Sequence, residues 1–578
     1  MKTTTLLIAF AISLAGCSPA DQPAAESSKA AASDTADTVY TNGKIYTVND
    51  GQPWAEAVAI KDGKFQVIGS AADVAAVTGE STTVIDLGGK FAMPGLIDAH
   101  THLMAISVDR VNLSITNAND KDAMLEEIKA HAKANPDAPY IRGGNWNLGV
   151  FENDSPRKEW LDAIDSTRPI YLYSQTGHEA WVNSAVIDLI DIKNREQDNR
   201  YIWDVDPETG EPSGTIREFS MSLVEQALEP AKSERLAPEL ATLITQFSEQ
   251  GFTAAKEAGA EVWTVQAANM LDKAGTLNMR LFPAWFHLGH IGAMTAEQSK
   301  ATAANWEDYE SAMVYPRYVK MYADGSSISH SSLLFDDYAD RPGFKGAISF
   351  PYETYVEDFS YFNNLGLGMM VHVYGDGTSE KIIEAFEAVR QRNGDNGSPL
   401  HFSHSFMITP DQIARLAKIS DVSMDFMTLQ YPHDSIIGSF VLTIGEERYQ
   451  KWLNARAAAE NDIPFGFGSD WPSSVVPVLN GFYEMQGFVT RRNPYEPEKG
   501  TLNASQAITL EQAVYGFTMG GAHTLGFDWP EKIGSIEEGK LADFIVTDRN
   551  IFEIPIETLK DTKVEKTVVG GRVVFERE

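Results

Sequence analysis

The chain has 578 residues, of which 43% are hydrophobic and 22% are charged, and this composition supports a large buried core and excludes disorder throughout. The formal net charge of -34 argues against nucleic acid or an anionic membrane surface as a partner, because phosphate binding needs clustered Lys and Arg. The length also indicates more than one structural unit.

The first residues are typical of an export signal. An early Lys is followed by an apolar stretch from Leu6 to Leu14 and by small residues before Cys17, the only cysteine in the chain. A single cysteine has no partner for a disulfide. The letters LAGC resemble a bacterial lipobox, which implies a signal peptide over residues 1–17 and a lipid-acylated Cys17. Ser18 after it implies anchoring to the outer membrane, facing the periplasm.

A flexible tether is expected over residues 18–38, which are rich in Ala, Ser, Asp and Pro. Residues 39–94 and 525–578 both contain short strands of alternating polarity between glycine turns, a pattern that predicts hairpins. We expect these two segments to form one composite β-domain, a small β-sandwich. No segment after the signal has the ~20 consecutive apolar residues that a membrane-spanning helix needs.

Residues 95–524 alternate apolar strand-like runs with amphipathic helical stretches, as parallel β/α units do. This pattern predicts an α/β fold whose centre is a (β/α)8 barrel. The segment exceeds the ~250 residues of a plain barrel, so insertions are required. We expect the main one at about residues 105–245, which are rich in loops and Trp.

Polar side chains stand at the ends of several of these apolar runs. His100 and His102, two residues apart on one strand, project from the same face and can bind one metal ion together. A buried Lys without a partner is costly, so a lysine in such a run needs an explanation. Together the six candidates favour a metal site at the carboxyl-terminal mouth of a barrel: His100, His102, Lys320, His372, His404 and Asp470. His401 competes with His404 for its place, and either one alone is equally consistent with a core histidine.

Two longer segments make the pattern more specific. MPGLIDAHTHL and GSIEEGKLADFIVTD resemble the first barrel strand and the closing β-domain strand of the amidohydrolase superfamily. YVKMYADGS, HVYGD, FGSDWP and GHEAWVNS are similar to its family 3 branch, which includes N-substituted formamide deformylases. The resemblance covers the chain from Val39 to its end.

The resemblance implies a role for each ligand. His100 and His102 would bind a first metal, His372 and His404 would complete a second site, and Lys320, carboxylated on Nζ, would bridge the two. Asp470 would contact the first metal and act as general base.

Nitrogen and oxygen ligands fit zinc, as one or two ions, without excluding other divalent metals. The expected reaction is hydrolysis of an amide-type C–N bond in a small molecule by metal-activated water. Three alternatives stay open: a metal-dependent deaminase, a cyclic-amide hydrolase, and an inactive barrel that serves as a tethered binding protein. A homo-oligomer is neither required nor excluded.

Other candidates carry weaker signals. His178 matches a branch motif and would contact the substrate carbonyl, or it is a loop hydrogen-bonding residue. Trp146 and Trp181 line an apolar pocket or pack in the core. Asp324 orients a ligand or caps a helix.

Several positions leave the bridging ligand and the substrate open. Lys256 and Glu257 offer another bridging pair, ranked below Lys320, and His433 remains undecided. Gly377, Thr378 and Ser403 depart from the branch pattern and leave the substrate open.

Overall fold

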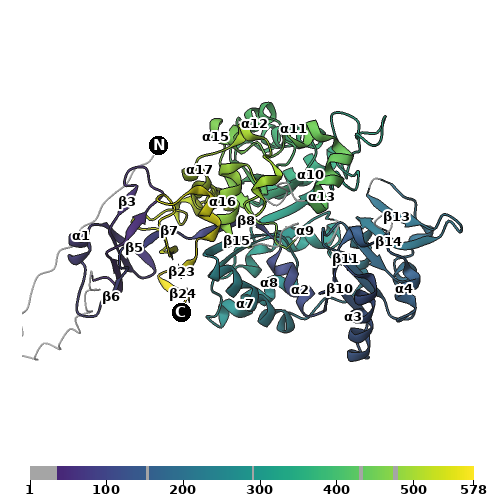
Figure 1. The fold of residues 1–578 in the computed structure, drawn as a ribbon, viewed down its shortest axis with the longest axis horizontal. Coiled ribbons are helices and arrows are strands. Elements are labelled where there is room, and N and C mark those ends of the chain that lie inside the picture. The colour runs from purple at the N-terminus through teal and green to yellow at the C-terminus, as the bar shows by residue number, and fades with distance from the viewer. Residues whose placement is uncertain (1–34, 152–154, 199, 290–291, 428–433, 473–478) are drawn as a thin grey trace, which may run out of the picture.

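The computed structural model describes residues 35–151, 155–198, 200–289, 292–427, 434–472 and 479–578 (Figure 1). At its centre lies an eight-stranded parallel sheet in the order β21-β20-β19-β18-β17-β16-β15-β8. The backbone N–H of Asp470, after β21, donates to the carbonyl of His100 in β8 at 2.8 Å, which brings the two edge strands together. The predicted barrel is therefore confirmed. Its strands are β8 (Leu96–Thr101), β15 (Phe252–Ala260), β16 (Arg280–Phe286), β17 (Tyr318–Tyr322), β18 (Gly368–Val373), β19 (Leu400–His404), β20 (Val422–Met427) and β21 (Phe465–Gly468).

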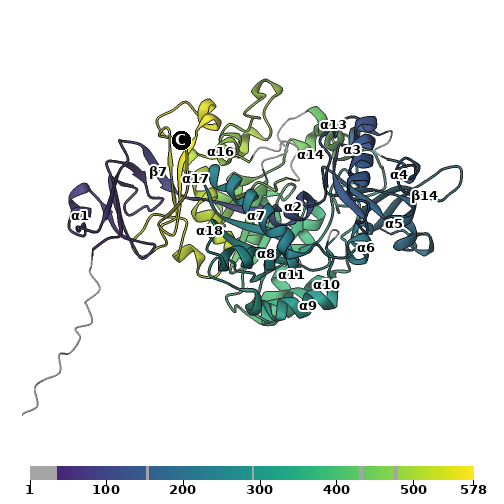
Figure 2. The same cartoon turned by 90° about the horizontal axis from the view of Figure 1, so that it is seen from below.

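Every residue of these eight strands is buried, which explains why their sequences are continuous apolar runs rather than alternating ones. Helices surround the strands on the outside (Figures 1 and 2). They include α7 (Ser233–Glu249), α8 (Val262–Lys273), α10 (Tyr352–Asn364), α11 (Asp376–Asn393), α16 (Gly481–Thr490) and α18 (Met519–Leu525). The hydrogen-bond or ion-pair partners of a polar side chain on these strands must therefore lie inside the barrel or at its mouth.

Two further sheets lie at the end of the molecule where the described chain begins and ends (Figure 1). A four-stranded sheet has the order β5-β4-β1-β6, and a six-stranded sheet has the order β24-β23-β22-β7-β2-β3. The second sheet joins both ends of the chain, because β22 pairs antiparallel with β7. The strands are β1 (Thr38–Thr41), β2 (Lys44–Tyr46), β3 (Trp54–Ala55), β4 (Ala57–Lys61), β5 (Lys64–Gly69), β6 (Thr83–Asp86), β7 (Phe91–Pro94), β22 (Phe544–Thr547), β23 (Val564–Val569) and β24 (Arg572–Glu576).

Between β8 and β15 the chain forms a fourth sheet, in the order β13-β14-β12-β11-β10-β9, at the opposite end of the molecule (Figures 1 and 2). We call it the inserted sheet. Its strands are β9 (Leu113–Ser114), β10 (Ile141–Trp146), β11 (Ile170–Ser174), β12 (Glu179–Val182), β13 (Tyr201–Val205) and β14 (Pro212–Glu218). The helices α3 (Lys121–Ala134), α4 (Lys158–Asp162), α5 (Ser184–Leu189) and α6 (Ser220–Ala227) accompany it, whereas α2 (Leu103–Arg110) packs mainly against the barrel helix α7. This sheet stands beside the barrel and brings its own side chains toward the barrel mouth.

Among the described residues, no helix is both long and apolar enough to cross a membrane. The predicted lipidation site Cys17 lies outside the described residues, as does His433.

Candidate metal centre

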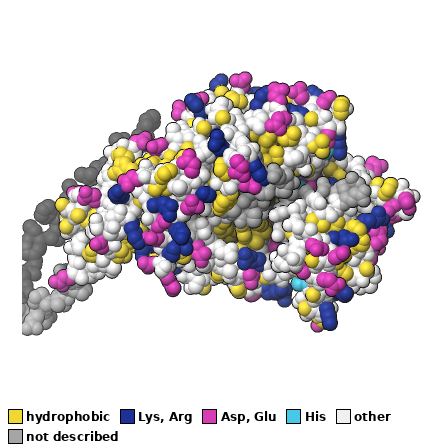
Figure 3. Space-filling model, viewed as in Figure 1, with side chains coloured by type: hydrophobic (Ala, Val, Ile, Leu, Met, Phe, Trp, Pro, Cys, Tyr) yellow, Lys and Arg dark blue, Asp and Glu magenta, His cyan; other side chains and the backbone are white. Residues whose placement is uncertain are grey.

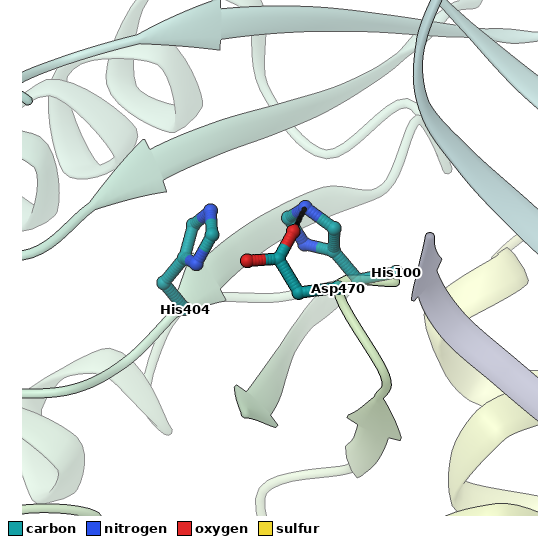
Figure 4. A group of neighbouring side chains, drawn as sticks. All are labelled: His100, His404 and Asp470. Carbon is teal, nitrogen blue, oxygen red and sulfur yellow. Dashed lines mark ion pairs between the residues drawn. The ribbon is translucent and has the colours of Figure 1, made fainter. Parts of the chain in front are cut away.

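Three of the predicted ligands meet at the mouth of the barrel (Figure 4). His100 in β8, His404 at the end of β19 and Asp470 just after β21 place one ligand atom each within 4.8 Å of one another. The distance from Asp470 Oδ1 is 3.5 Å to His100 Nε2 and 3.2 Å to His102 Nε2. One carboxylate oxygen thus lies between His100 in β8 and His102, which follows β8.

His372 and Lys320 complete this group. The ring of His372 lies 4.1 Å from that of His404, which in turn lies 4.5 Å from that of His100, measured between centroids. Lys320 is fully buried on β17, and burial lowers its pKa to about 8 despite the opposing charges of Asp425 and Asp470. The six predicted ligands therefore lie near one another at the barrel mouth, on or just after five of its strands.

The pocket fits a divalent cation. His100 Nε2, Lys320 Nζ and His404 Nδ1 are buried and have no hydrogen-bond partner among the described residues, an arrangement that a folded protein normally avoids. Burial, and then neighbouring cationic groups, lower the pKa of both His100 and His404 well below the usual value, so both rings are neutral. Neutral imidazole is the form that binds metals, and nitrogen ligands with a carboxylate suit zinc or a similar ion.

Two of the predicted ligands have an unusual backbone conformation that orients their side chains. His404 and Asp470 have φ angles of 74° and 50°, in the left-handed region that non-glycine residues seldom adopt. Both stand where a barrel strand ends, so the turn redirects the side chain into the mouth. Such conformations concentrate at functional sites.

Beneath the ligands, Asp425 on β20 holds the histidines in place. It lies 3.2 Å from His100 Nδ1 and 2.9 Å from His401 Nε2, and accepts a hydrogen bond from Ser403 Oγ at 2.9 Å. Ser403 Oγ also contacts His100 Nδ1 at 2.7 Å. Burial raises the pKa of Asp425, but His401 and His404 more than offset it, and the carboxyl stays ionised. Such outer partners fix the tautomer and orientation of a ligating histidine.

Sequence analysis had not recognised Asp425, and had noted Ser403 only as a departure from the branch pattern. The signal was present, since an Asp inside the apolar run VSMDFM is as unusual as Lys320 in its own strand.

His401 faces the barrel interior rather than the metal ligands. Its Nδ1 lies 2.7 Å from Lys256 Nζ, which also donates to the carbonyl of Thr524 at 2.6 Å. Glu257 accepts from the backbone N–H groups of Met104 and Ala105 at 2.8 and 3.3 Å, at the start of α2. The structure therefore places His404, not His401, beside His100, and it engages Lys256 and Glu257 in structural contacts.

His178 reaches the same mouth from the inserted sheet, with its ring centroid 6.2 Å from that of His372. Its Nδ1 lies 3.1 Å from Glu218 Oε2, and Ser331 Oγ donates to Glu218 Oε1 at 2.7 Å. Burial lowers the pKa of His178, but Glu218 raises it further, to about 9. The ring is thus a cation at neutral pH, positioned by a carboxylate that sequence analysis did not identify.

The remaining candidates have other partners. Trp146 and Trp181 are buried in the core of the inserted sheet, where their Nε1 atoms donate to the carbonyls of Leu172 and Arg157. Asp324 accepts from the backbone N–H groups of Tyr374 and Gly375 at 3.0 and 2.9 Å, at the start of α11. The structure does not bring either Trp into the cavity described next. Asp324 contacts the backbone just before α11, and its Oδ1 also lies 3.7 Å from Nε2 of the predicted ligand His372.

A cavity of about 430 Å³ opens beside these ligands, between the barrel and the inserted sheet. His102 and Trp471 line it at the metal centre. Its size lies in the range of small-molecule sites, ~300–1,000 Å³.

Comparison with known proteins places this geometry in a family. The sequence model that describes the amidohydrolase family matches residues 83–575 of this chain. The chain is 25% identical to the N-substituted formamide deformylase of Arthrobacter pascens over 94% of this chain and 98% of that protein. It is also 25% identical to the putative amidohydrolase YtcJ of Bacillus subtilis (strain 168), over 93% of this chain and 99% of that one. A metal-dependent hydrolase from Pyrococcus furiosus shares the fold with a TM-score of 0.66 and 21% identity, over 89% of this chain and 99% of that one.

Proposed function

The chain belongs to the amidohydrolase family, whose relatives act on C–N bonds other than peptide bonds, and we propose that it hydrolyses an amide-type bond of a small molecule with metal-activated water. The observation that supports this proposal most directly is the cluster of neutral, buried histidines around Asp470 Oδ1. A divalent cation, proposed to be zinc as one or two ions, lowers the pKa of water toward ~7 and polarises a carbonyl oxygen when bound.

The residues of the chain supply the proton transfers. Asp470 lies at the mouth with its carboxylate between two histidines, where it accepts the proton of the attacking water and returns it to the leaving nitrogen. His178, a cation held by Glu218, donates a hydrogen bond to the oxygen that becomes negative as the carbonyl is attacked.

Lys320 is proposed to carry a carboxylate on Nζ. Its neutral amine attacks carbon dioxide, an N–C bond forms, and a proton leaves to solvent. The product replaces a buried nitrogen that lacks a partner among the described residues with two oxygens that can bridge metals. Burial of Lys320 favours this step because it increases the share of neutral amine.

The named activity of the Arthrobacter relative makes N-substituted formamides the first substrates to assay, followed by other N-acyl amines. We further propose that Cys17 is lipid-acylated after removal of the preceding residues, so that the enzyme faces the periplasm and meets the membrane only through this anchor. The strong negative charge of the chain argues against nucleic acid as a partner.

Metal content tests the proposal. Protein lacking residues 1–17 is purified, supplied with zinc and bicarbonate, and measured by inductively coupled plasma mass spectrometry beside Lys320→Ala and Asp470→Ala. Lys193→Ala, a surface substitution of the same kind, is the matched control. We expect about two divalent ions per chain in the control and fewer in both site variants. Absence of stoichiometric metal in every sample would contradict the mechanism and favour the binding-protein alternative.

A further inference from the structure

The cavity beside the metal centre ends in a group of acidic side chains. Asp109 from α2, Glu225 from α6 and Glu261, at the start of α8, all line it. Glu225 and Glu261 are 6% and 7% exposed, so they are removed from bulk water and face the cavity. On the surface shown in Figure 3, hydrophobic side chains line a hollow where the barrel meets the inserted sheet.

One cation faces these three carboxylates. Arg142 on β10 donates to Glu225 Oε2, and its Nη2 lies 3.9 Å from Asp109 Oδ1. Arg110 also lines the cavity, but it is exposed and bonds Gln246 at 3.5 Å. Arg142 therefore satisfies Glu225 and leaves the other two acids incompletely paired.

The two carboxylate oxygens of Glu261 differ in their hydrogen bonds. Its Oε1 accepts from the backbone N–H of Ala293 at 2.6 Å, whereas its Oε2 is buried and has no hydrogen-bond partner among the described residues. Asp109 Oδ1 likewise lacks a hydrogen bond within the described part of the chain. Burial, which disfavours the charged form, raises the pKa of Glu261 to about 8 and that of Asp109 to about 7, so a cation bound between them would favour their ionised forms.

Aromatic side chains also line the cavity. Tyr171, Tyr173, Trp263, Phe286 and Trp471 line it. Aromatic faces accommodate both an apolar chain and a cation. Such a wall suits a molecule with an apolar body that carries its charge at one end.

We propose that Glu261 and Asp109 form a subsite for a positively charged nitrogen, so that the substrate is an N-acyl amine with an ammonium or amidinium group beyond an apolar spacer. The group donates hydrogen bonds to Glu261 Oε2 and Asp109 Oδ1 while the amide lies at the metal centre beside His102. This inference rests on the proposed hydrolysis for its reaction, but the subsite itself binds an amine without any reaction.

A matched set of compounds tests the charge requirement. N-formyl and N-acetyl derivatives of cadaverine, hexylamine and ε-aminocaproate share one five-carbon spacer and end in ammonium, methyl and carboxylate. We expect kcat/KM for the ammonium compound to exceed that for the methyl compound by about tenfold or more, because a hydrogen bond to a charged group contributes that much. The carboxylate compound is expected to be the poorest substrate.

Variants then assign the preference. Glu261→Gln should reduce the ratio of kcat/KM for the ammonium compound to that for the methyl compound by about tenfold, and metal content measured on the same sample excludes loss of metal as the cause. Asp109→Asn should reduce it in the same direction. Glu297→Gln, the same change at an exposed position on α9 (Ala296–Ala304), is the control and should behave as the parent protein.

Binding of the free amines separates the two proposals. Calorimetric titration should show hexylamine, which is a cation at neutral pH, binding at least about tenfold more tightly than the uncharged 1-hexanol, and Glu261→Gln should remove this difference. If no amide is hydrolysed but this difference is present, the subsite stands and the proposed reaction fails. Equal hydrolysis of the ammonium and methyl compounds by the parent protein would overturn the subsite and leave the reaction intact, and this comparison needs no variant.

Discussion

At the residue scale, the histidine ligands depend on side chains that do not touch the metal themselves. His100 contacts Ser403 and Asp425 through Nδ1, which leaves Nε2 directed at Asp470. At Ser403, a departure from the branch pattern, this chain orients His100 with a hydroxyl backed by the Asp425 carboxylate from the next strand. Ser403, which departs from the branch pattern, thus helps to hold the metal ligand His100 in place.

The Ser403 bridge can be tested by substitution. Ser403→Ala removes the hydroxyl between His100 Nδ1 and Asp425 Oδ2, and we expect zinc affinity to fall ~10–100-fold, as loss of such outer partners typically does. Chelator competition measures the affinity. Ser423→Ala on the adjacent strand is the matched control, because Ser423 Oγ is buried but makes no hydrogen bond among the described residues. An equal loss in both variants would attribute the effect to packing alone.

Asp470 offers a second test at this scale. Asp470→Asn keeps the shape of the side chain but removes its ability to accept a proton, so kcat for a formamide substrate should fall ~10²–10⁴-fold. Metal content measured on the same sample distinguishes lost proton transfer from lost metal. Asp188→Asn, an exposed aspartate in α5, should leave kcat unchanged. Retention of near-parental kcat in Asp470→Asn would remove Asp470 from the role of general base.

At the scale of elements, a buried ion pair joins the barrel to the sheet that both chain ends share. Arg280 on β16 donates through Nε and Nη2 to the two carboxylate oxygens of Asp543, at 2.7 and 3.1 Å. Asp543 directly precedes β22 and also accepts from the backbone N–H of Gly570 at 2.6 Å. This bidentate contact joins a barrel strand to the sheet that both chain ends share.

Breaking that pair should be costly, whereas replacing it should not. Arg280→Met alone leaves a buried carboxylate without its cation, and we expect a loss of ~3–5 kcal/mol in the free energy of unfolding. The double variant Arg280→Met with Asp543→Leu removes both charges and should recover much of that loss. Denaturant unfolding of the metal-loaded protein measures both. A double variant as unstable as the single one would show that the pair itself stabilises the junction.

The elements also show what the sequence can and cannot predict. Each barrel strand is a continuous apolar run, because strands buried on both faces need no polar side, and polar residues at their ends stood out clearly. His100, Lys320, His372, His404 and Asp470 could be predicted for that reason. Asp425 and Glu218 were missed because their roles depend on register between neighbouring strands and on contacts between the inserted sheet and the barrel. The apolar run VSMDFM marked Asp425 as unusual, but no local pattern showed which histidines it would contact.

At the scale of the whole molecule, 81 acidic side chains outnumber 47 basic ones, and this imbalance reaches into the interior. The acidic end of the cavity is one example, with Asp109, Glu225 and Glu261 around Arg142. A protein that buries more negative than positive charge in one cavity stabilises the protonated acids there. Its folding must then depend on pH.

Glu261 makes this dependence measurable. Burial, with a smaller contribution from the charge of Glu225, raises its pKa from 4.5 to about 8, against the opposing backbone hydrogen bonds from Ala293 and Met294 and the charge of Arg142. Between these values the folded chain holds a proton that the unfolded chain has lost, so stability contributed at this position decreases as pH rises from about 4.5 to about 8. Gln does not titrate, so Glu261→Gln should remove this dependence of the free energy of unfolding on pH.

We therefore expect the stability of Glu261→Gln relative to the parent protein to increase by a few kcal/mol between about pH 5 and about pH 9. Denaturant unfolding of the metal-loaded proteins at several pH values measures this difference, with Glu297→Gln as the surface control. The difference should shrink when cadaverine is present at high pH, because an ammonium ion stabilises the ionised carboxylate of the parent but gains less from the amide of the variant. A difference that is independent of pH would mean that Glu261 is ionised in the folded chain at every pH tested, and that a cation of the protein already compensates it.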